Sequence, residues 1–199
     1  MLSLALIPTG VLIAVILFLD IKLGYYLVAL TLPFSINLPI SFLHITLNVP
    51  LEPLLLFLSI TTIYQIALKG MAIAYIKQPL SILFICFTTL LLLSSLFSTQ
   101  ILVSLRMCIQ TLAYIIPAYW GILFLSRNDT TFIRNILLIP LISFSIICFI
   151  NFIRHSTHYF DRSYAVSMAQ PFYSDHTIYA TMAALMIPIA FTFMLWYFG

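Results

Sequence analysis

The sequence predicts an all-α fold, a polytopic bundle of about seven transmembrane helices, and three observations support this prediction. Hydrophobic residues make up 63% of the 199 residues, whereas charged residues make up only 7%. The mean hydropathy of the chain is +1.17. Because a soluble domain carries about 25% charged residues, a soluble core could not bury this much apolar surface. The third observation is that the apolar residues form runs long enough to cross a bilayer.

The apolar runs provide the expected spans, and they cover residues 2–19, 23–42, 52–68, 79–97, 107–125, 135–153 and 178–198. A membrane-spanning helix needs roughly 20 mostly apolar residues. Backbone groups in lipid must find partners within their own segment, which favours helices, since the strands of a barrel would alternate in polarity. Pro33 and Pro39 interrupt the second run, and we expect a short helix there, followed by a broken, partly interfacial segment.

Short connectors separate the runs. We expect "STQILVSLR", residues 98–106, to be an interfacial connector and "SRNDTTFIR", residues 126–134, to be a polar loop. The first run follows the initial methionine with no basic segment, which favours a retained span over a cleaved signal peptide. The last run ends at "MLWYFG" without a polar tail. We therefore expect residues 1–199 to form a single transmembrane domain, the N-terminal portion of a longer membrane protein.

The basic residues predict an orientation in the membrane. The connectors after the odd-numbered runs hold Lys22, Lys69, Lys77, Arg127 and Arg134, and those after the even-numbered runs hold Arg106, Arg154 and Arg162. This bias of five against three predicts that the first set is cytoplasmic and that the 154–177 loop lies on the outer face. The net charge of +3 is spread over many loops, which excludes the clustered basic patch typical of nucleic-acid binding.

Neither the cysteines nor the histidines predict a metal site. The cysteines lie inside apolar runs without a C-x-x-C pair, and we interpret them as small apolar residues at helix contacts: Cys86, Cys108 and Cys148. His155, His158 and His176 lie in or beside one loop, but no H-E-x-x-H motif accompanies them. We therefore expect no metal and no other cofactor.

The loop "RHSTHYFDRSYAVSMAQPFYSDHT", residues 154–177, is the longest polar stretch of the chain. One interpretation is a solvated hairpin, with Arg154 extending to the lipid headgroups. The other is an anion site, because the planar guanidinium of Arg162 suits phosphate oxygens. Asp175 and His176 stand where the last helix should begin, and a helix N-terminus also favours an anion. This second interpretation predicts a site for the phosphate of a lipid carrier at the membrane surface.

The residues of this loop and of the run after it resemble the signature of a known protein family. "PFYSDHTIYATMAALMIPIAF", preceded by Arg162, resembles the signature of the O-antigen ligase and polymerase superfamily. In that family an arginine-containing loop leads into an F-x-x-[DN]-[HN] helix start, and the helix continues to a proline, here Pro188. "NVPLEPLLLFL" is similar to the family's Pro-x-Glu entry to an early span. "SSLFSTQILVSLRMCIQTLAYIIPAYWG" is similar to its serine-rich span end, connector and following span.

The resemblance implies a multi-pass glycosyltransferase of the bacterial inner membrane, with its functional loop facing the periplasm. The donor would be a glycan on undecaprenyl pyrophosphate, and the acceptor would be a sugar hydroxyl, such as one on the lipid A core. Arginines would hold the pyrophosphate while a base deprotonates the acceptor. The matching residues are Arg162, Asp175 and His176, with Arg106 as a weaker substrate-binding candidate. The family's acceptor-activating histidine lies in a second half that this chain lacks, so no catalytic residue is assigned.

Three other functions fit parts of the pattern. The same family includes polysaccharide polymerases, which pass the glycan to another repeat unit. A transporter or flippase would use helices broken at Pro33, Pro117 and Pro140, although the runs hold almost no ionisable residues of the kind that mark a transport pathway. A non-catalytic scaffold would pack small residues such as Ala180 and Ala184 against a partner helix.

Overall fold

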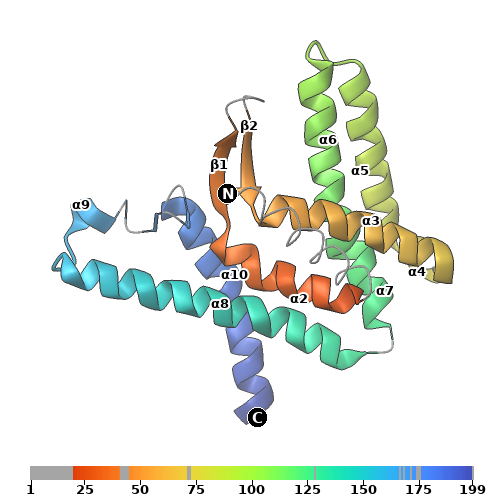
Figure 1. Cartoon of the computed structure of the whole chain (residues 1–199). Coiled ribbons are helices and arrows are strands. Elements are labelled where there is room, and N and C mark those ends of the chain that lie inside the picture. The colour runs from red at the N-terminus through yellow and green to blue at the C-terminus, as the bar shows by residue number, and fades with distance from the viewer. Residues whose placement is uncertain are drawn as a thin grey trace, which may run out of the picture. The chain divides into compact units, whose positions relative to one another are not determined.

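The computed structural model describes residues 20–198, apart from 41–44, 71–72, 128, 166, 168, 171 and 174–175 (Figure 1). The predicted first span and Asp175 lie outside the described residues. The chain divides into two compact units. The first unit comprises Met1–Tyr25 and Glu52–Ile133, and the second unit comprises Tyr26–Leu51 and Arg134–Gly199.

The described elements are mainly helical. In chain order they are α2 (Ile21–Thr31), the 3-10 helix η1 (Leu32–Phe34), β1 (Ile36–Ile40), β2 (Ile45–Val49), α3 (Leu51–Lys69), α4 (Ile73–Ile76), α5 (Pro79–Leu96), α6 (Ile101–Ile115), the π-helical segment η2 (Ile116–Gly121), α7 (Ile122–Ser126), α8 (Thr130–Thr157), α9 (Arg162–Ala165) and α10 (His176–Phe198).

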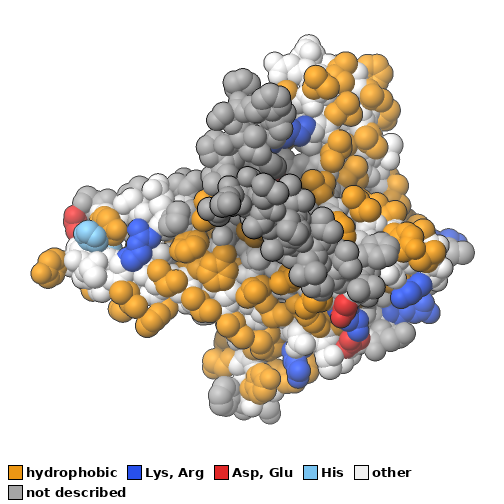
Figure 2. Space-filling model, viewed as in Figure 1, with side chains coloured by type: hydrophobic (Ala, Val, Ile, Leu, Met, Phe, Trp, Pro, Cys, Tyr) orange, Lys and Arg blue, Asp and Glu red, His pale blue; other side chains and the backbone are white. Residues whose placement is uncertain are grey.

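Among the described residues, five helices are long and apolar enough to cross a membrane: Leu51–Lys69, Pro79–Leu96, Ile101–Ser126, Thr130–Thr157 and His176–Tyr197. They match the predicted third to seventh spans. Their outward side chains are largely apolar, as in Leu83 and Leu90 on α5, which are 62% and 66% exposed, and Figure 2 shows hydrophobic side chains over much of the face in view. An apolar exterior of this kind fits lipid and would be costly in water. The helical class and the membrane environment are therefore as predicted.

The region of the predicted second span forms a short helix followed by a β-hairpin. The apolar helix covers only Ile21–Phe34, and β1 then pairs with β2 in an antiparallel register from Ile36 opposite Val49 to Ile40 opposite Ile45. The expected short helix is present, and the segment after it, which we expected to be broken, forms two strands. Pro33 stands at the start of the 3-10 turn, and β-branched residues such as Ile36 and Val49 favour strands. Pro39 lies in a two-stranded sheet, where a missing N–H is tolerated.

The predicted connector at residues 98–106 is shorter than expected, because α6 begins at Ile101. The amide of Ser104 donates to the carbonyl of Gln100 at 3.1 Å, so the helix is already formed at that point. No proline or glycine interrupts residues 101–115, and α6 packs along α5, side by side in Figure 1. Packing against a neighbouring helix extends the span beyond the predicted start at 107.

Two internal prolines do not break the helices in which they lie. One is accommodated by a wider, π-helical turn, and the other leaves its helix unchanged. Pro117 begins a π-helical turn between α6 and α7, and α8 continues through Pro140 without a break. Proline lacks the N–H that would complete an α-helical turn, and a π-turn accommodates that loss locally. A transporter was expected to have helices broken at Pro33, Pro117 and Pro140. Of these three prolines, only Pro33 lies at the end of an apolar helix, Ile21–Phe34.

Tyr25 fixes the π-turn within the first unit. Its hydroxyl donates to the carbonyl of Pro117 at 3.1 Å and lies 3.1 Å from Oγ1 of Thr62. A Cβ on Gly121 would lie 1.6 Å from the same hydroxyl oxygen. Only glycine leaves room for this three-helix contact, because any side chain would displace Tyr25 from α3 and the π-turn.

Candidate functional site

The segment after α8, residues 158–175, is structured in its described part and packs onto its own unit. Ala169 and Tyr173 are 1% and 7% exposed, and they belong to a core cluster with Phe144, Ile147 and Met186 of α8 and α10. The rings of Phe144 and Tyr173 meet edge to face with centroids 6.5 Å apart. The segment therefore differs from a fully solvated hairpin, since one side of it is part of the hydrophobic core.

Two interactions hold the C-terminal end of this segment. Nη1 of Arg154 donates a hydrogen bond to the carbonyl of Gln170, so this side chain turns back onto the protein instead of only extending to lipid headgroups. The ring of Phe172 lies edge to face with Phe34, with centroids 5.9 Å apart. Arg154, on α8, therefore fixes the segment sixteen residues later in the chain.

The turn that ends α8 has an unusual backbone. Tyr159 and Phe160 have φ angles of +53° and +57°, in the left-handed region that costs L-residues roughly 1–2 kcal/mol each. The amide of Phe160 donates to the carbonyl of His155 at 3.1 Å, which closes the helix end. The Phe160 ring packs against Phe152 and against the edge of His155, at centroid distances of 5.7 and 5.1 Å. These contacts offset the strain and direct the chain into α9.

The predicted substrate-binding residues occupy different places. Arg162 is exposed and begins α9 within the anchored segment, and His176 is exposed and begins α10 directly after it, so both stand at helix starts of the second unit. Arg106 is exposed on α6 in the first unit. Asp175, expected to cap α10, lies outside the described residues. That α10 begins at His176 agrees with the helix start predicted from the sequence.

The histidines of this region contact aromatic rings. His158 stacks on Tyr164 with centroids 3.7 Å apart and an interplanar angle of 26°, and His155 contacts Phe160 as described above. Among the described residues, no group of three or more His, Cys, Asp or Glu side chains is arranged to hold a metal ion.

Sequence reasoning missed a set of buried polar atoms in the same unit. Asn151 of α8 is 1% exposed, and neither atom of its amide makes a hydrogen bond of good geometry within the part of the chain that the structure describes. The same holds for the hydroxyl of Tyr173 and for Nδ1 of His155. Buried polar groups normally find partners, and those that do not are often bound to water or ligand. An asparagine inside the apolar run "CFINFI" was the signal available in the sequence.

Other polar groups near Asn151 and Tyr173 do have hydrogen-bond partners. The hydroxyl of Tyr179 donates to Sγ of Cys148 at 3.3 Å, and the Tyr179 ring lies 5.6 Å from that of Tyr173. Burial raises the pKa of Tyr173 to about 12, so its hydroxyl stays protonated at neutral pH and can donate a hydrogen bond. The second unit thus combines two exposed side chains that can carry positive charge, Arg162 and His176, with buried donors that have capacity for a further partner.

Comparison of the chain with protein-family models, with curated proteins and with solved structures gives no match. The description of the fold and of the candidate site therefore rests on the sequence and the structure of this chain.

Proposed function

We propose that the protein acts in glycan transfer at the bacterial inner membrane, as an O-antigen ligase-like glycosyltransferase. It would take a glycan from an undecaprenyl-pyrophosphate carrier, and a sugar hydroxyl of the lipid A core would be the acceptor. The sequence resemblance around Arg162 and His176 motivates the proposal. The observation that best supports it is that the segment between these residues is anchored while both of their side chains remain exposed.

The chemistry of the donor explains why this arrangement suits it. A lipid pyrophosphate presents two phosphates at the bilayer surface, and negative charge increases on the leaving group as the glycosyl bond breaks. The guanidinium of Arg162 would pair with phosphate oxygens in a bidentate manner. His176 begins α10, where the backbone N–H groups of a helix point toward an anion. A segment held by Ala169, Tyr173 and Arg154 would limit movement of these groups during the reaction.

The test is an assay of glycan transfer in membranes that contain the protein, its undecaprenyl-pyrophosphate donor and a lipid A core acceptor. Arg162→Ala should reduce transfer by roughly 10²–10³-fold, the cost of removing one donor that stabilises developing charge. Arg162→Lys should recover only part of the rate, because lysine keeps the charge without the bidentate fork. His176→Ala should also lower the rate without loss of protein from the membrane.

Arg134→Ala is the matched control, because this exposed arginine lies near the start of α8, outside the segment. It should transfer glycan at the parental rate. Supplying a repeat unit in place of lipid A core distinguishes a polymerase from a ligase. Parental activity in Arg162→Ala, or absence of transfer to both acceptors in the parental protein, would reject the proposal.

A further inference from the structure

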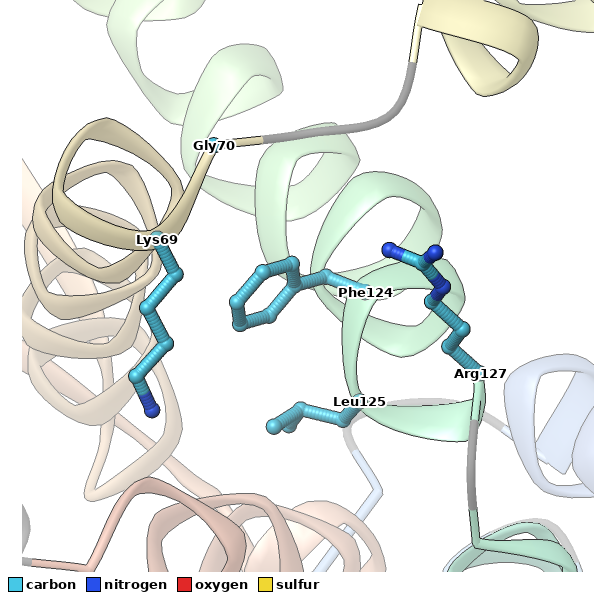
Figure 3. A pocket seen from close by; sticks show the side chains of 5 residues that line it. All are labelled: Lys69, Gly70, Phe124, Leu125 and Arg127. Carbon is cyan, nitrogen blue, oxygen red and sulfur yellow. The ribbon is translucent and has the colours of Figure 1, made fainter.

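A pocket in the first unit lies apart from the residues considered above. It has a volume of about 290 Å³, and its described lining is Lys69 and Gly70 at the end of α3 and Phe124, Leu125 and Arg127 at the end of α7. In Figure 3, Phe124 and Leu125 point from α7 toward the aliphatic stem of Lys69, whereas the guanidinium of Arg127, at the end of the same helix, lies on the opposite side of Phe124. The pocket therefore has an apolar wall and two cations.

Both cations lie at the same membrane surface if the helices cross as their lengths predict. Lys69 ends the helix Leu51–Lys69, and Arg127 directly follows the helix Ile101–Ser126, with the crossing helix Pro79–Leu96 between them. Two further crossings return the chain to the surface that it left. Lys22 agrees with this arrangement, because its Nζ lies 2.6 Å from Oδ2 of Asp129 in the turn after α7.

The charges of the described groups that surround the pocket add up to a positive value. A helix C-terminus carries roughly half a negative charge, so the ends of α3 and α7 together oppose an anion by about one unit. Lys69 and Arg127 contribute two positive charges, which leaves an excess of about one. The described lining includes no carboxylate. The balance favours an anion over a cation, and the apolar wall favours one that carries hydrocarbon.

Gly70, which lines the pocket, ends α3. Its φ is +71°, and a Cβ built there would have no atom within 4 Å. Its amide donates to the carbonyl of Ile66 at 2.9 Å, which ends α3 in the left-handed cap that glycine adopts readily. The helix thus ends directly after Lys69, at a residue that places no side chain beside the pocket.

We propose that this pocket binds the phosphate headgroup of an anionic phospholipid. Pockets that enclose a drug-sized ligand measure roughly 300–1,000 Å³, so this one suits a headgroup and the first part of an acyl chain better than a whole lipid. Lys69 contacts the phosphate, and Phe124 and Leu125 contact the glycerol and upper chain. Arg127, whose guanidinium lies on the other side of Phe124 in Figure 3, adds attraction from the rim of the pocket. Basic pockets between membrane helices recognise anionic headgroups in this way. The site is independent of the proposed glycan transfer.

Native mass spectrometry of the delipidated protein, titrated with phosphatidylglycerol or phosphatidylcholine, tests this proposal. Phosphatidylglycerol should bind more tightly than phosphatidylcholine. The double variant Lys69→Gln with Arg127→Gln should weaken phosphatidylglycerol binding by roughly tenfold or more, as expected for two cations near a phosphate. The charge-conserving variant Arg127→Lys should retain most of the binding, which separates loss of charge from loss of fold.

The control is Lys77→Gln with Arg134→Gln, which removes the same charge from exposed residues that the topology assigns to the same surface but that do not line the pocket. It should weaken binding by less than about threefold, since charges outside the pocket act only through a screened field. Equal losses in the two double variants, or equal affinity for the two lipids, would overturn the proposal. Full displacement of the lipid by millimolar inorganic phosphate at constant ionic strength would assign the pocket to free phosphate instead.

Discussion

Buried polar side chains of the first unit join different helices, whereas several of those in the second unit lack a hydrogen-bond partner. In the first unit Tyr25 bonds to Pro117 and Thr62, and the hydroxyl of Ser59 donates to the carbonyl of Ala113 at 2.9 Å. In the second unit the buried hydroxyl of Tyr173 and Nδ1 of His155 have no partner within the described chain. The buried amide of Asn151 lies near the Tyr179 hydroxyl but makes no hydrogen bond of good geometry there. The contrast has an exception, since Oε1 of Gln65 in the first unit is also unsatisfied.

This difference indicates two uses of polar groups in an apolar chain. A hydrogen bond between helices that face lipid fixes their relative position, because neither partner has water as an alternative. An unsatisfied buried group instead costs roughly 1–3 kcal/mol. Its retention is easiest to explain where a ligand or an ordered water completes it. We therefore expect substitutions in the first unit to change stability and those in the second to change binding or transfer.

The largest effect should come from Gly121→Ala. The new methyl group would lie 1.6 Å from Oη of Tyr25 and 3.0 Å from Cγ2 of Thr62, so Tyr25 must move and lose both of its hydrogen bonds. Overpacking together with these losses should cost about 3 kcal/mol or more in the free energy of unfolding. Reversible unfolding in mild detergent measures this quantity.

Tyr25→Phe combined with Gly121→Ala should recover part of that loss, because it removes the oxygen closest to the new methyl group. Ala118→Leu is a control in the same π-turn, and its exposed side chain should leave stability nearly unchanged. A Gly121→Ala protein as stable as the parent would mean that α2 does not pack against the π-turn as described.

The second prediction compares one chemical change in the two units. Tyr25→Phe leaves the Pro117 carbonyl and the buried Thr62 hydroxyl without this partner, and should cost about 1–3 kcal/mol. Tyr173→Phe removes a hydroxyl that has no described partner, so its effect on stability should be close to zero or slightly favourable. The same unfolding measurement applies to both variants. Equal costs would remove the contrast, and would indicate that the Tyr173 hydroxyl is bound by a structural water.

The sequence alone was sufficient for the helical class and for the positions of five helices long and apolar enough to cross a membrane. Run length and composition determine these properties, since each helix satisfies its own backbone wherever lipid surrounds it. The hairpin at 36–49 was missed because a short apolar stretch rich in isoleucine has the same composition as a helix in lipid. The start of α6 was missed because contact with α5, and not local composition, extends the helix to Ile101.

The candidate site was predictable only in part. Arg162 and His176 could be chosen because charge is rare in this chain, and the structure describes both as exposed helix starts. The anchoring of their segment was not predictable, because it depends on Tyr173 entering a core formed by α8 and α10. Long-range packing of this kind leaves no periodic signal. Pairing of Asp175 with His176 stays a prediction, since Asp175 lies outside the described residues.

The third prediction concerns Asn151, whose buried amide lies near the Tyr179 hydroxyl but makes no hydrogen bond of good geometry within the described chain. Asn151→Leu keeps the approximate volume and removes the polar atoms, so it should raise the free energy of unfolding by about 1 kcal/mol. If the amide contacts substrate, the same variant should reduce glycan transfer while the protein becomes more stable. Loss of stability would show instead that the amide has a partner in the folded protein, and would end its role as a candidate contact.

The smallest effect should come from Lys22 and Asp129. Hydrogen bonds from Lys22, from the Thr131 hydroxyl and from the Phe132 amide hold the pKa of Asp129 well below its usual range. A carboxylate with a lowered pKa stabilises the folded state above its unfolded pKa, near 3.9, and loses that contribution as the pH falls through the folded value. Because the pair is on the surface, its side chains being 40% and 25% exposed, the contribution should be small and sensitive to salt.

Asp129→Asn tests the charge separately from the helix cap. Asparagine keeps an oxygen that can accept from the Phe132 amide, now 3.0 Å from Oδ1, so the cap on α8 is retained while the ion pair is lost. The difference in melting temperature between parent and variant should be positive at pH 7. It should shrink as the pH is lowered below 3.9, and it should also shrink in about 1 M salt, where the Debye length is near 3 Å.

Asp20→Asn, which preserves the capping oxygen on α2, is the matched control. A difference that is independent of both pH and salt would assign the stabilisation to the cap geometry, and Lys22 would then contribute no measurable attraction to this turn.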